Sequence, residues 1–374
     1  MLLLDRYIFR EWLKVFVMTI AAMIGLLLIA KMFSDVQDFI RWKASTLLAL
    51  EYFALQIPTY LPVVLPVALL ISVLFILGFL HRNQELTAMR ATGLSIFRLT
   101  RVLWISGAVL SLVLFVLNAT VVPLAMERSK LLAETAEFDY EGKRAGGIDK
   151  VDKASVLAYA NNTENRIWFI NRFSGYTGRG IGVSVYQNDD SGLTQAAWFA
   201  KTGYYDAERG CWVLKDGWRV LYHPEAKEDG PQTRQERFSE LVMSDLTERP
   251  RIMMALTKKP THLSINEIKG VLDDVGVDKS VRMSSYAVQY HYVLASPFCC
   301  LIVVGLAIPF AVSGVRVNPM VGVSKSIVLF ALYYLLTNVF SLLGAQQHLP
   351  PLLAAWLPNF IMLALAAWLC RRVN

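Results

Sequence analysis

The chain has 374 residues, of which 55% are apolar and 18% are charged, and its formal net charge at pH 7 is +7. A typical soluble domain has about 25% charged residues, so this composition excludes an ordinary soluble protein and indicates a membrane protein. The positive charge does not indicate nucleic-acid binding, because residues 123–285 hold 23 Lys and Arg against 24 Asp and Glu, and the excess lies in or beside the apolar segments.

Six stretches of the sequence are apolar over the length of about 20 residues that a helix needs to cross a bilayer. They run from Leu13 to Ala30, Tyr60 to Leu80, Val102 to Val122, Tyr286 to Val312, Val321 to Leu343 and Leu352 to Leu369. The alternative for the first stretch is a signal peptide, but the stretch is long and no small-residue cleavage pattern ends it. We therefore predict an integral membrane protein with six transmembrane helices.

Basic residues mark one side of these predicted spans. They gather in the N-terminal tail, in the link after the second span and at the C-terminus. The residues are Arg6, Arg10, Lys14, Arg82, Arg90, Arg98, Arg101, Arg371 and Arg372. By the positive-inside rule, both termini and this link are cytoplasmic, and the long insert after the third span lies outside.

The second predicted span contains three prolines at a spacing of four residues, Pro58, Pro62 and Pro66. This spacing places them on one side of a helix. Proline removes a backbone donor and bends helices, and in lipid the freed carbonyls need partners from neighbouring helices. Two interpretations remain open: a helix that begins at Pro58 and tolerates its kinks, or a bent helix that moves.

The link after the second span, "RNQELTAMRATGLSIFR" at residues 82–98, has the signals of a short helix. Asn83 can cap it, and Glu85 lies in the first turn, where the helix dipole favours a carboxylate. We predict a helix at about 82–96 whose apolar residues share one face and dock into a groove of a cytoplasmic partner. The residues assigned to this docking helix are Glu85, Leu86, Met89, Arg90 and Gly93, of which the glycine ends it.

Three cations lie at the predicted outer ends of the first and third spans. Lys31 follows the first span, and Arg128 and Lys130 follow the third. Lys31 can extend its ammonium to the lipid headgroups, and the other two can belong to a solvated helix end. The alternative is that all three meet an anionic group such as a phosphate that arrives from the outer face.

The insert, residues 123–285, changes from apolar helical runs to short aromatic and β-branched segments such as "NRIWFINRF" and "CWVLKDGWRVLYH". Turn-forming clusters separate these segments, which indicates an all-β sandwich, barrel or jellyroll. Ser264 and Glu267 then form a capping-box pattern that predicts a short connecting helix. The predicted domains are thus residues 1–122 with three spans, the insert at 123–285, and residues 286–374 with three more spans.

No motif for catalysis or metal binding occurs in the sequence. A phosphate-binding G-x-x-x-x-G-K-[ST] loop and a G-x-S-x-G nucleophile motif are missing, and the five histidines lack the spacing of metal ligands. We therefore expect no catalytic residue, no metal and no cofactor. Any ATP hydrolysis that drives the protein is expected in a partner chain.

Several segments resemble the LptF/LptG family of lipopolysaccharide-export permeases, and they are closer to LptG than to LptF. They are "LDRYIFREWLK" at 4–14, "RNQELTAMRATGLSIFR" at 82–98, "PTHLSINEIKGVL" at 260–272 and "YHYVLASPFCCLIVVGLAIPFAV" at 290–312. The resemblance covers essentially the whole chain. It implies three spans, a periplasmic β-jellyroll and three more spans, in a multi-pass protein of the bacterial inner membrane.

The resemblance also implies a function and partners. The chain would be a permease subunit of an ABC exporter that extracts lipopolysaccharide from the outer leaflet of the inner membrane and passes it to a periplasmic β-jellyroll bridge. A cytoplasmic LptB-like ATPase dimer would contact Glu85, a homologous LptF-like permease would complete the membrane part, and an LptC/LptA-like jellyroll protein would receive the lipid. Lys31 matches a basic residue that faces the lipid A phosphates, and Lys130 approximately matches a second, with Arg128 beside it.

Two other classes of function are consistent with parts of the sequence. A membrane receptor or mechanotransmission protein with an external β sensor domain would have the same insert and the same cytoplasmic helix. A membrane-embedded hydrolase or transferase would need a polar constellation at bilayer depth, and the predicted spans offer only scattered Ser, Thr and Asn. Trapping of glycolipid in the inner membrane on depletion would distinguish an exporter from a receptor.

Overall fold

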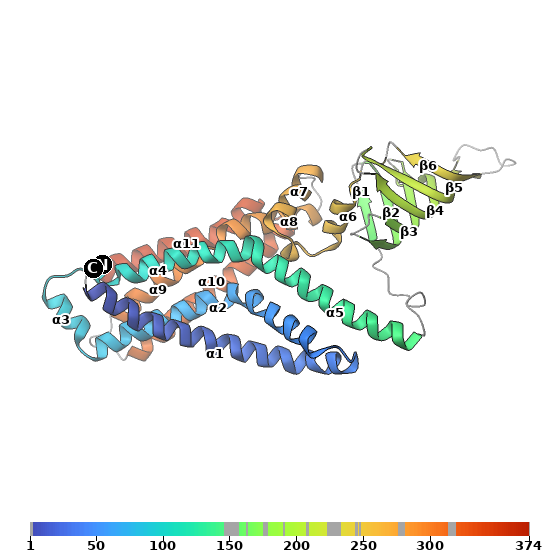
Figure 1. Cartoon of the computed structure of the whole chain (residues 1–374). Helices are drawn as coiled ribbons and strands as arrows, with labels where there is room; N and C mark the ends of the chain where they lie inside the picture. Colours follow the sequence, from blue (N-terminus) through green and yellow to red (C-terminus); the bar gives the residue numbers. More distant parts are fainter. Residues whose placement is uncertain are drawn as a thin grey trace. The chain divides into compact units, whose positions relative to one another are not determined.

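The structure is a computed structural model that describes residues 3–145, 157–161, 164–174, 179–189, 191–206, 209–222, 233–243, 246, 248–275, 281–312 and 319–373. Figure 1 shows its elements in chain order. The helices are α1 (Leu3–Arg41), α2 (Thr46–Arg82), α3 (Glu85–Ala91), α4 (Ile96–Val116), the π-helix η1 (Leu117–Val121), α5 (Val122–Ala145), α6 (Pro250–Thr257), the 3-10 helix η3 (Pro260–His262), α7 (Ile265–Val275), α8 (Val281–Ala295), α9 (Phe298–Val312), α10 (Pro319–Ala345) and α11 (Pro351–Val373). The strands are β1 (Leu157–Asn161), β2 (Arg166–Ser174), β3 (Arg179–Asn188), β4 (Thr194–Asp206), β5 (Cys211–Tyr222) and β6 (Thr233–Met243).

The chain divides into two compact units. The helical unit comprises Met1–Tyr140 and Pro260–Asn374, and the β unit comprises Glu141–Lys259. The insert limits expected from the sequence, 123 and 285, therefore fall inside the helical unit. The first limit differs because α5 follows η1 directly, so the helix continues beyond the third span. The second differs because α7 packs against α8 and belongs with the spans.

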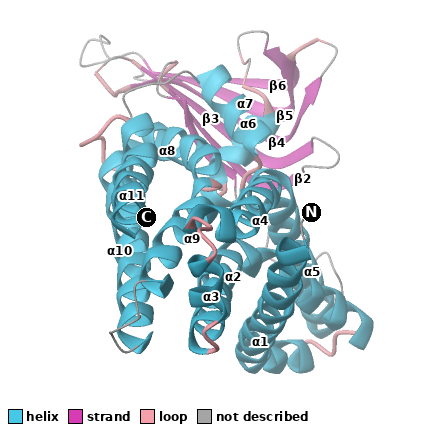
Figure 2. Cartoon of the chain, turned by 90° about the vertical axis from the view of Figure 1, so that its left-hand side faces the viewer, coloured by secondary structure: helices cyan, strands magenta, loops and turns pink. Residues whose placement is uncertain are grey.

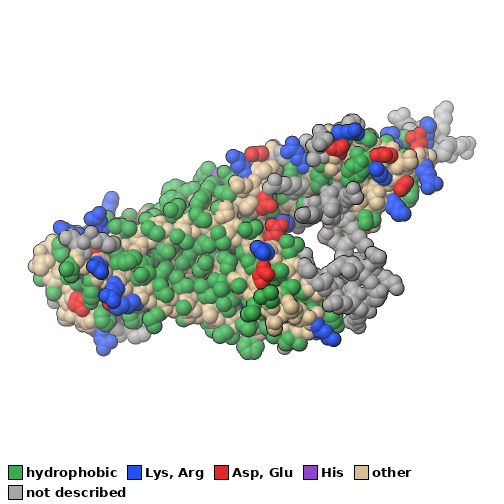
Figure 3. Space-filling model, in the orientation of Figure 1, with side chains coloured by type: hydrophobic (Ala, Val, Ile, Leu, Met, Phe, Trp, Pro, Cys, Tyr) green, Lys and Arg blue, Asp and Glu red, His purple; other side chains and the backbone are tan. Residues whose placement is uncertain are grey.

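The helical unit contains the predicted membrane spans. In the described part of the chain, five helices are long and apolar enough to cross a membrane, and α8 with α9 makes a sixth if the bent pair counts as one span. The two halves of this pair meet at an angle of 53°. Figure 3 shows a broad apolar belt over these helices, with Lys and Arg gathered at the end that carries α3 and both chain termini. Five of the six predicted spans are thus present as single helices, and the fourth is a bent pair.

Helix α2 lies at the centre of the helical unit, whose helices run side by side in Figure 2. It packs against α1 and α9, and 67% of its apolar window is buried within the chain. Pro58, Pro62 and Pro66 all lie inside this helix, which continues from Thr46 to Arg82. The structure therefore excludes a helix that begins at Pro58.

The β unit contains one six-stranded antiparallel sheet in the described residues, with the strands paired in chain order. This confirms the predicted all-β insert, and the strand order is that of a meander. Consecutive pairing follows from the turns that separate the strands, such as the one in which Asp189 accepts the backbone N–H groups of Ser191 and Leu193. Strands β1 and β6 are the outer strands of this sheet in the described residues.

The sheet is creased along one row of residues. In each pair of adjacent strands from β2 to β6, one pair of facing residues is missing from the regular pairing. The residues concerned form a row across the sheet: Asn171, Gly182, Lys201, Asp216 and Ser239. Gly182 and Asp216 have φ angles of 67° and 53°, which interrupt the alternation of side chains along a strand. A Cβ atom at Gly182 would lie 2.7 Å from Nδ2 of Asn171, so this position requires glycine.

The crease places the core of the β unit between the two halves of the sheet. Trp168 lies on one side of the row and Trp212 on the other, yet their ring centroids are 4.9 Å apart and both side chains are fully buried. The indole N–H of Trp212 donates to the backbone oxygen of Glu248 at 2.8 Å. A flat sheet would place these rings on opposite faces, so the bend creates the core.

The connecting helix α7 begins as the sequence predicts. The backbone N–H of Ser264 donates to Oε2 of Glu267 at 2.9 Å, and the backbone N–H of Glu267 donates to Oγ of Ser264 at 3.3 Å. These reciprocal bonds satisfy two donors that the start of a helix would otherwise leave free. The predicted capping box is confirmed.

Candidate functional site

The predicted docking helix is present as α3, a helix of seven residues at 85–91. It is shorter than the expected range of 82–96, because Asn83 ends α2 and does not cap α3. Gln84, with φ of 61°, makes the turn between the two helices. The chain leaves α3 at Gly93, whose φ of 82° is the conformation that glycine favours after a helix.

The side chains of α3 do not all face outward. Leu86 is only 3% exposed and belongs to the main apolar core of the helical unit, and Met89 packs against that core. Thr87, Ala88 and Arg90 are exposed. The apolar face that the sequence suggested for docking therefore anchors α3 to its own chain, and the surface open to a partner is small and polar.

Glu85 contacts the N-terminal helix. The hydroxyl of Tyr7, in the second turn of α1, donates to Oε2 of Glu85 at 3.1 Å. The carboxylate also lies in the first turn of α3, where the helix dipole favours a negative charge. This hydrogen bond joins the start of α1 to the start of α3.

The cation Lys31 is paired within the chain. Its ammonium lies 2.7 Å from Oδ2 of Asp35, one helical turn further along α1. The hydroxyl of Tyr52 on α2 donates to the same oxygen at 2.6 Å, and the hydroxyl of Ser34 donates to Oδ1 of Asp35. The Lys31 side chain remains 33% exposed, so the ion pair lies partly at the surface of the chain.

The cation Arg128 is paired in a similar way. Its guanidinium lies 3.2 Å from Oε1 of Glu51, and the two side chains are 67% and 42% exposed. Glu51 precedes Tyr52 on α2, so adjacent residues of α2 reach the charged groups of α1 and α5. Lys130 is exposed two residues beyond Arg128. The structure thus connects Lys31 and Arg128 through α2 and places a carboxylate beside each.

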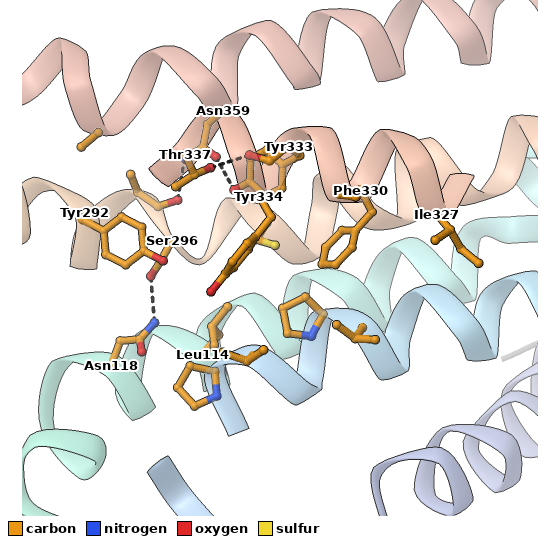
Figure 4. Close-up of a pocket in the computed structure, with 18 residues that line it drawn as sticks. Leu114, Asn118, Tyr292, Ser296, Ile327, Phe330, Tyr333, Tyr334, Thr337 and Asn359 are labelled. Carbon is orange, nitrogen blue, oxygen red and sulfur yellow. Dashed lines mark hydrogen bonds between the residues drawn. The ribbon is translucent and has the colours of Figure 1, made fainter. Parts of the chain in front are cut away.

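A cavity of about 360 Å³ lies among the spans (Figure 4). Its apolar lining includes Pro62 and Pro66 of α2, Leu114 of α4, and Ile327 and Phe330 of α10. This volume lies in the range of small-molecule sites, which are mostly apolar with a few polar groups. The arrangement can hold an apolar chain.

Polar groups gather at one side of this cavity. Nδ2 of Asn118 donates to Oγ of Ser296 at 2.9 Å, and Nδ2 of Asn359 donates to the backbone oxygen of Ala295 at 2.8 Å. Oδ1 of Asn359 accepts the hydroxyl of Tyr333 at 2.6 Å. Figure 4 shows these side chains converging from different helices on the break between α8 and α9.

Sequence reasoning missed this group of residues. The signal was present, because asparagine within an apolar span is a candidate for hydrogen bonding between helices. Asn118 and Asn359 both occur in such spans, and Pro297 follows Ser296 inside the fourth. No local pattern indicates that residues 118, 296 and 359 meet.

The comparison with known proteins covers almost the entire chain. The sequence model of the family described as "Lipopolysaccharide export system permease LptF/LptG" matches residues 6–372. Two curated relatives, both named lipopolysaccharide export system permease protein LptG, come from Escherichia coli strain K12 and Escherichia coli O6:H1 strain CFT073. Each is 24% identical to this chain over 374 residues, which is 99% of this chain and 98% of the relative.

Proposed function

The chain belongs to the LptF/LptG family of lipopolysaccharide export system permeases, and from this membership we propose that it is the LptG-like subunit of an ABC exporter. In this proposal it extracts lipopolysaccharide from the outer leaflet of the inner membrane and passes it to a periplasmic β-jellyroll bridge. A separate cytoplasmic ATPase supplies the energy. The observation that carries the proposal is the apolar cavity among the spans, which suits the acyl chains of a glycolipid.

The distribution of charge supports an orientation for the chain. Lys and Arg gather at the end of the helical unit that carries α3 and both termini (Figure 3), and basic residues favour the cytoplasmic side. In the proposed orientation both termini are cytoplasmic and the β unit lies in the periplasm. Lys31, Arg128 and Lys130 then lie beyond the outer ends of the apolar stretches of α1 and of α4 with η1, where they meet the phosphates of lipid A.

The proposed contact with an LptB-like ATPase dimer lies on the exposed side of α3. Thr87, Ala88 and Arg90 form this side, and Glu85 contributes its carboxylate at the start of the helix. Burial of Leu86 makes the helix part of the core of the helical unit. Force applied by the ATPase would therefore act on the spans without first deforming a loop.

The proposed contact with an LptF-like permease lies on α1 and α10. Only 6% of the apolar window of α1 and 11% of that of α10 are buried within the chain, against 67% for α2. Helices with so little cover from their own chain suit packing against a second membrane protein. The substrate path would then lie between the two permeases.

The proposed contact with an LptC/LptA-like bridge uses the open sheet. The outer strand β6 carries backbone donors and acceptors that can pair with a strand of another β protein. Strand β6, Thr233–Met243, is exposed along most of its length. This addition of a strand would continue the sheet of the β unit into the bridge protein.

The proposal is tested by photocrosslinking in the intact exporter. A photoreactive p-benzoylphenylalanine replaces Phe330, which lines the cavity, and in a control it replaces Leu112, which is 66% exposed on α4 and does not line the cavity. We expect lipopolysaccharide in the crosslinked product at Phe330 and much less at Leu112. Equal labelling at both sites, or a product without any lipid A glycolipid, would refute the proposed substrate and favour a receptor.

A further inference from the structure

Four polar side chains beside the cavity form a group that we call the polar clamp: Asn118, Ser296, Tyr333 and Asn359. They come from η1, from the junction of α8 and α9, from α10 and from α11. All four line the cavity, and Ser296, Tyr333 and Asn359 are less than 9% exposed. The clamp therefore brings together four segments that are distant in sequence.

The clamp compensates for a break in the fourth span. The chain bends by 53° between α8 and α9, where Ser296 and Pro297 interrupt the helix. A break of this kind frees backbone carbonyls, which are strongly destabilising in an apolar environment if they lack a donor. The amide of Asn359 donates to the backbone oxygen of Ala295 at 2.8 Å, so α11 satisfies an acceptor that the bend exposes.

The opposite side of the break faces a second irregular segment. Residues 117–121 form the π-helix η1, and its Asn118 donates to the hydroxyl of Ser296 at 2.9 Å. That hydroxyl donates in turn to the backbone oxygen of Val293 at 3.2 Å. A π-helix within a regular helix is uncommon and is frequently found at functional sites. Here it brings Asn118 to the broken span.

The bend contributes to the shape of the cavity. Tyr292 lies before the break and Cys299 lies after it, and both line the cavity together with Ser296. A change in the angle between α8 and α9 moves these side chains relative to each other. Tyr333 of α10 lines the same cavity, next to Phe330 and Tyr334. Its hydroxyl donates to Oδ1 of Asn359 at 2.6 Å.

We propose that Asn359 is a positioning residue that holds the bend of the fourth span and thereby sets the length of acyl chain that the cavity accepts. The inference rests on the proposed function, since it requires an acylated substrate. Asn359 acts through the backbone of Ala295 and through Tyr333, and it has no step of its own in transport.

The test uses a set of glycolipids that differ only in acyl-chain length. It measures the affinity of the intact exporter for each of them, in the wild type and in Asn359→Ala. A pocket discriminates one methylene by roughly tenfold, so we expect the ratio of affinities for a short-chain and a long-chain lipid to change about tenfold in Asn359→Ala. Asn359→Gln, which keeps the amide, is expected to restore part of the ratio. The matched control is Asn338→Ala, because Asn338 is exposed and donates only within its own helix to Tyr334 in the contacts described.

Tyr333→Phe provides a second variant, which keeps the bond from Asn359 to Ala295 and loses only a hydroxyl. We expect a smaller change of the ratio in the same direction. Equal weakening for every chain length in Asn359→Ala would show a structural role alone and overturn the proposal, as would an unchanged ratio in both variants. If the wild type binds no glycolipid, the proposed substrate is wrong. If the wild type binds glycolipid and the ratio is unchanged in the variants, only the role of Asn359 is wrong.

Discussion

Replacement of Asp35 by Asn is expected to strengthen binding of a phosphate-bearing lipid to the proposed exporter. Asp35 holds the ammonium of Lys31 at 2.7 Å, so a phosphate that approaches Lys31 must compete with this carboxylate. Asparagine keeps the size of the side chain and an oxygen that can accept the hydroxyl of Tyr52. The substitution therefore removes the charge while the packing between α1 and α2 remains.

The magnitude follows from the exposure of the pair. The side chains of Lys31 and Asp35 are 33% and 17% exposed, so the pair is partly screened by solvent. An ion pair of this kind contributes up to about 1 kcal/mol, which corresponds to a factor of about five in affinity. We therefore expect the lipid to bind up to about fivefold more tightly, with slower release.

The assay compares binding of a diphosphorylated lipid A with a dephosphorylated form, at low and high salt. The gain in Asp35→Asn should appear only with the phosphorylated lipid, and high salt should reduce it because screening weakens exposed charges. Asp38→Asn is the matched control. Asp38 lies on the same helix but pairs with Arg41 at 4.0 Å, and both side chains are more than half exposed.

Two results would refute this reasoning. Weaker binding in Asp35→Asn would show that the carboxylate orients the ammonium of Lys31 for the phosphate and does not compete with it. An equal gain for the dephosphorylated lipid would show that the effect does not involve phosphate. In contrast, Lys31→Ala should remove the preference for the phosphorylated lipid if Lys31 contacts phosphate.

Two further predictions concern the β unit and the cytoplasmic contact. Glu248→Ala removes the buried carboxylate that lies 3.2 Å from Arg166. Hydrogen exchange of the β2 amides should then report a free energy of opening that is lower by about 3–5 kcal/mol. Glu164→Ala removes an exposed partner of the same arginine and should lower this free energy by less than about 1 kcal/mol. Tyr7→Phe removes the hydroxyl that donates to Glu85, and we expect intact ATPase association with a severalfold lower ratio of transport to ATP hydrolysis. Loss of association would contradict a role in transmission.

The spans and the inserted sheet were predictable because each element has a signal in its own sequence. A run of about 20 apolar residues suffices to predict a transmembrane helix, and short aromatic segments between turns suffice for strands. The capping box at Ser264 and Glu267 formed as expected for the same reason, since both partners lie within one helical turn. The crease of the sheet was not predicted, because the Asp216-Gly217 pair inside the segment "CWVLKDGWRVLYH" is a turn signal that does not say whether a strand ends or bends there.

The orientation of α3 shows where a helical pattern becomes ambiguous. The spacing of Leu86 and Met89 predicts an apolar face, and that face exists. The pattern does not say whether the face meets a partner or the protein's own core. Leu86 is 3% exposed, so this face meets the protein's own core. Only the packing of α3 against the spans shows this.

Pairing of the outer cations could not be read from the sequence for a related reason. Lys31 and Asp35 are four residues apart, a spacing that suggests an ion pair on α1. Glu51 and Arg128, in contrast, are distant in sequence and meet only because α2 and α5 are neighbours at this point. Two of the three cations predicted to face a phosphate, Lys31 and Arg128, thus have a carboxylate beside them.

The least regular parts of the helical unit coincide with its cavity. A π-helix at 117–121, a break at 296–297 and prolines in α2 all depart from ideal helix geometry, and each contributes a residue to the cavity lining. Local rules favour straight helices in lipid, so departures persist where other contacts compensate for them. Asn118 and Asn359 provide those contacts by donating to the broken span. The same hydrogen bonds that make the irregular helices stable therefore also shape the space that the substrate is proposed to occupy.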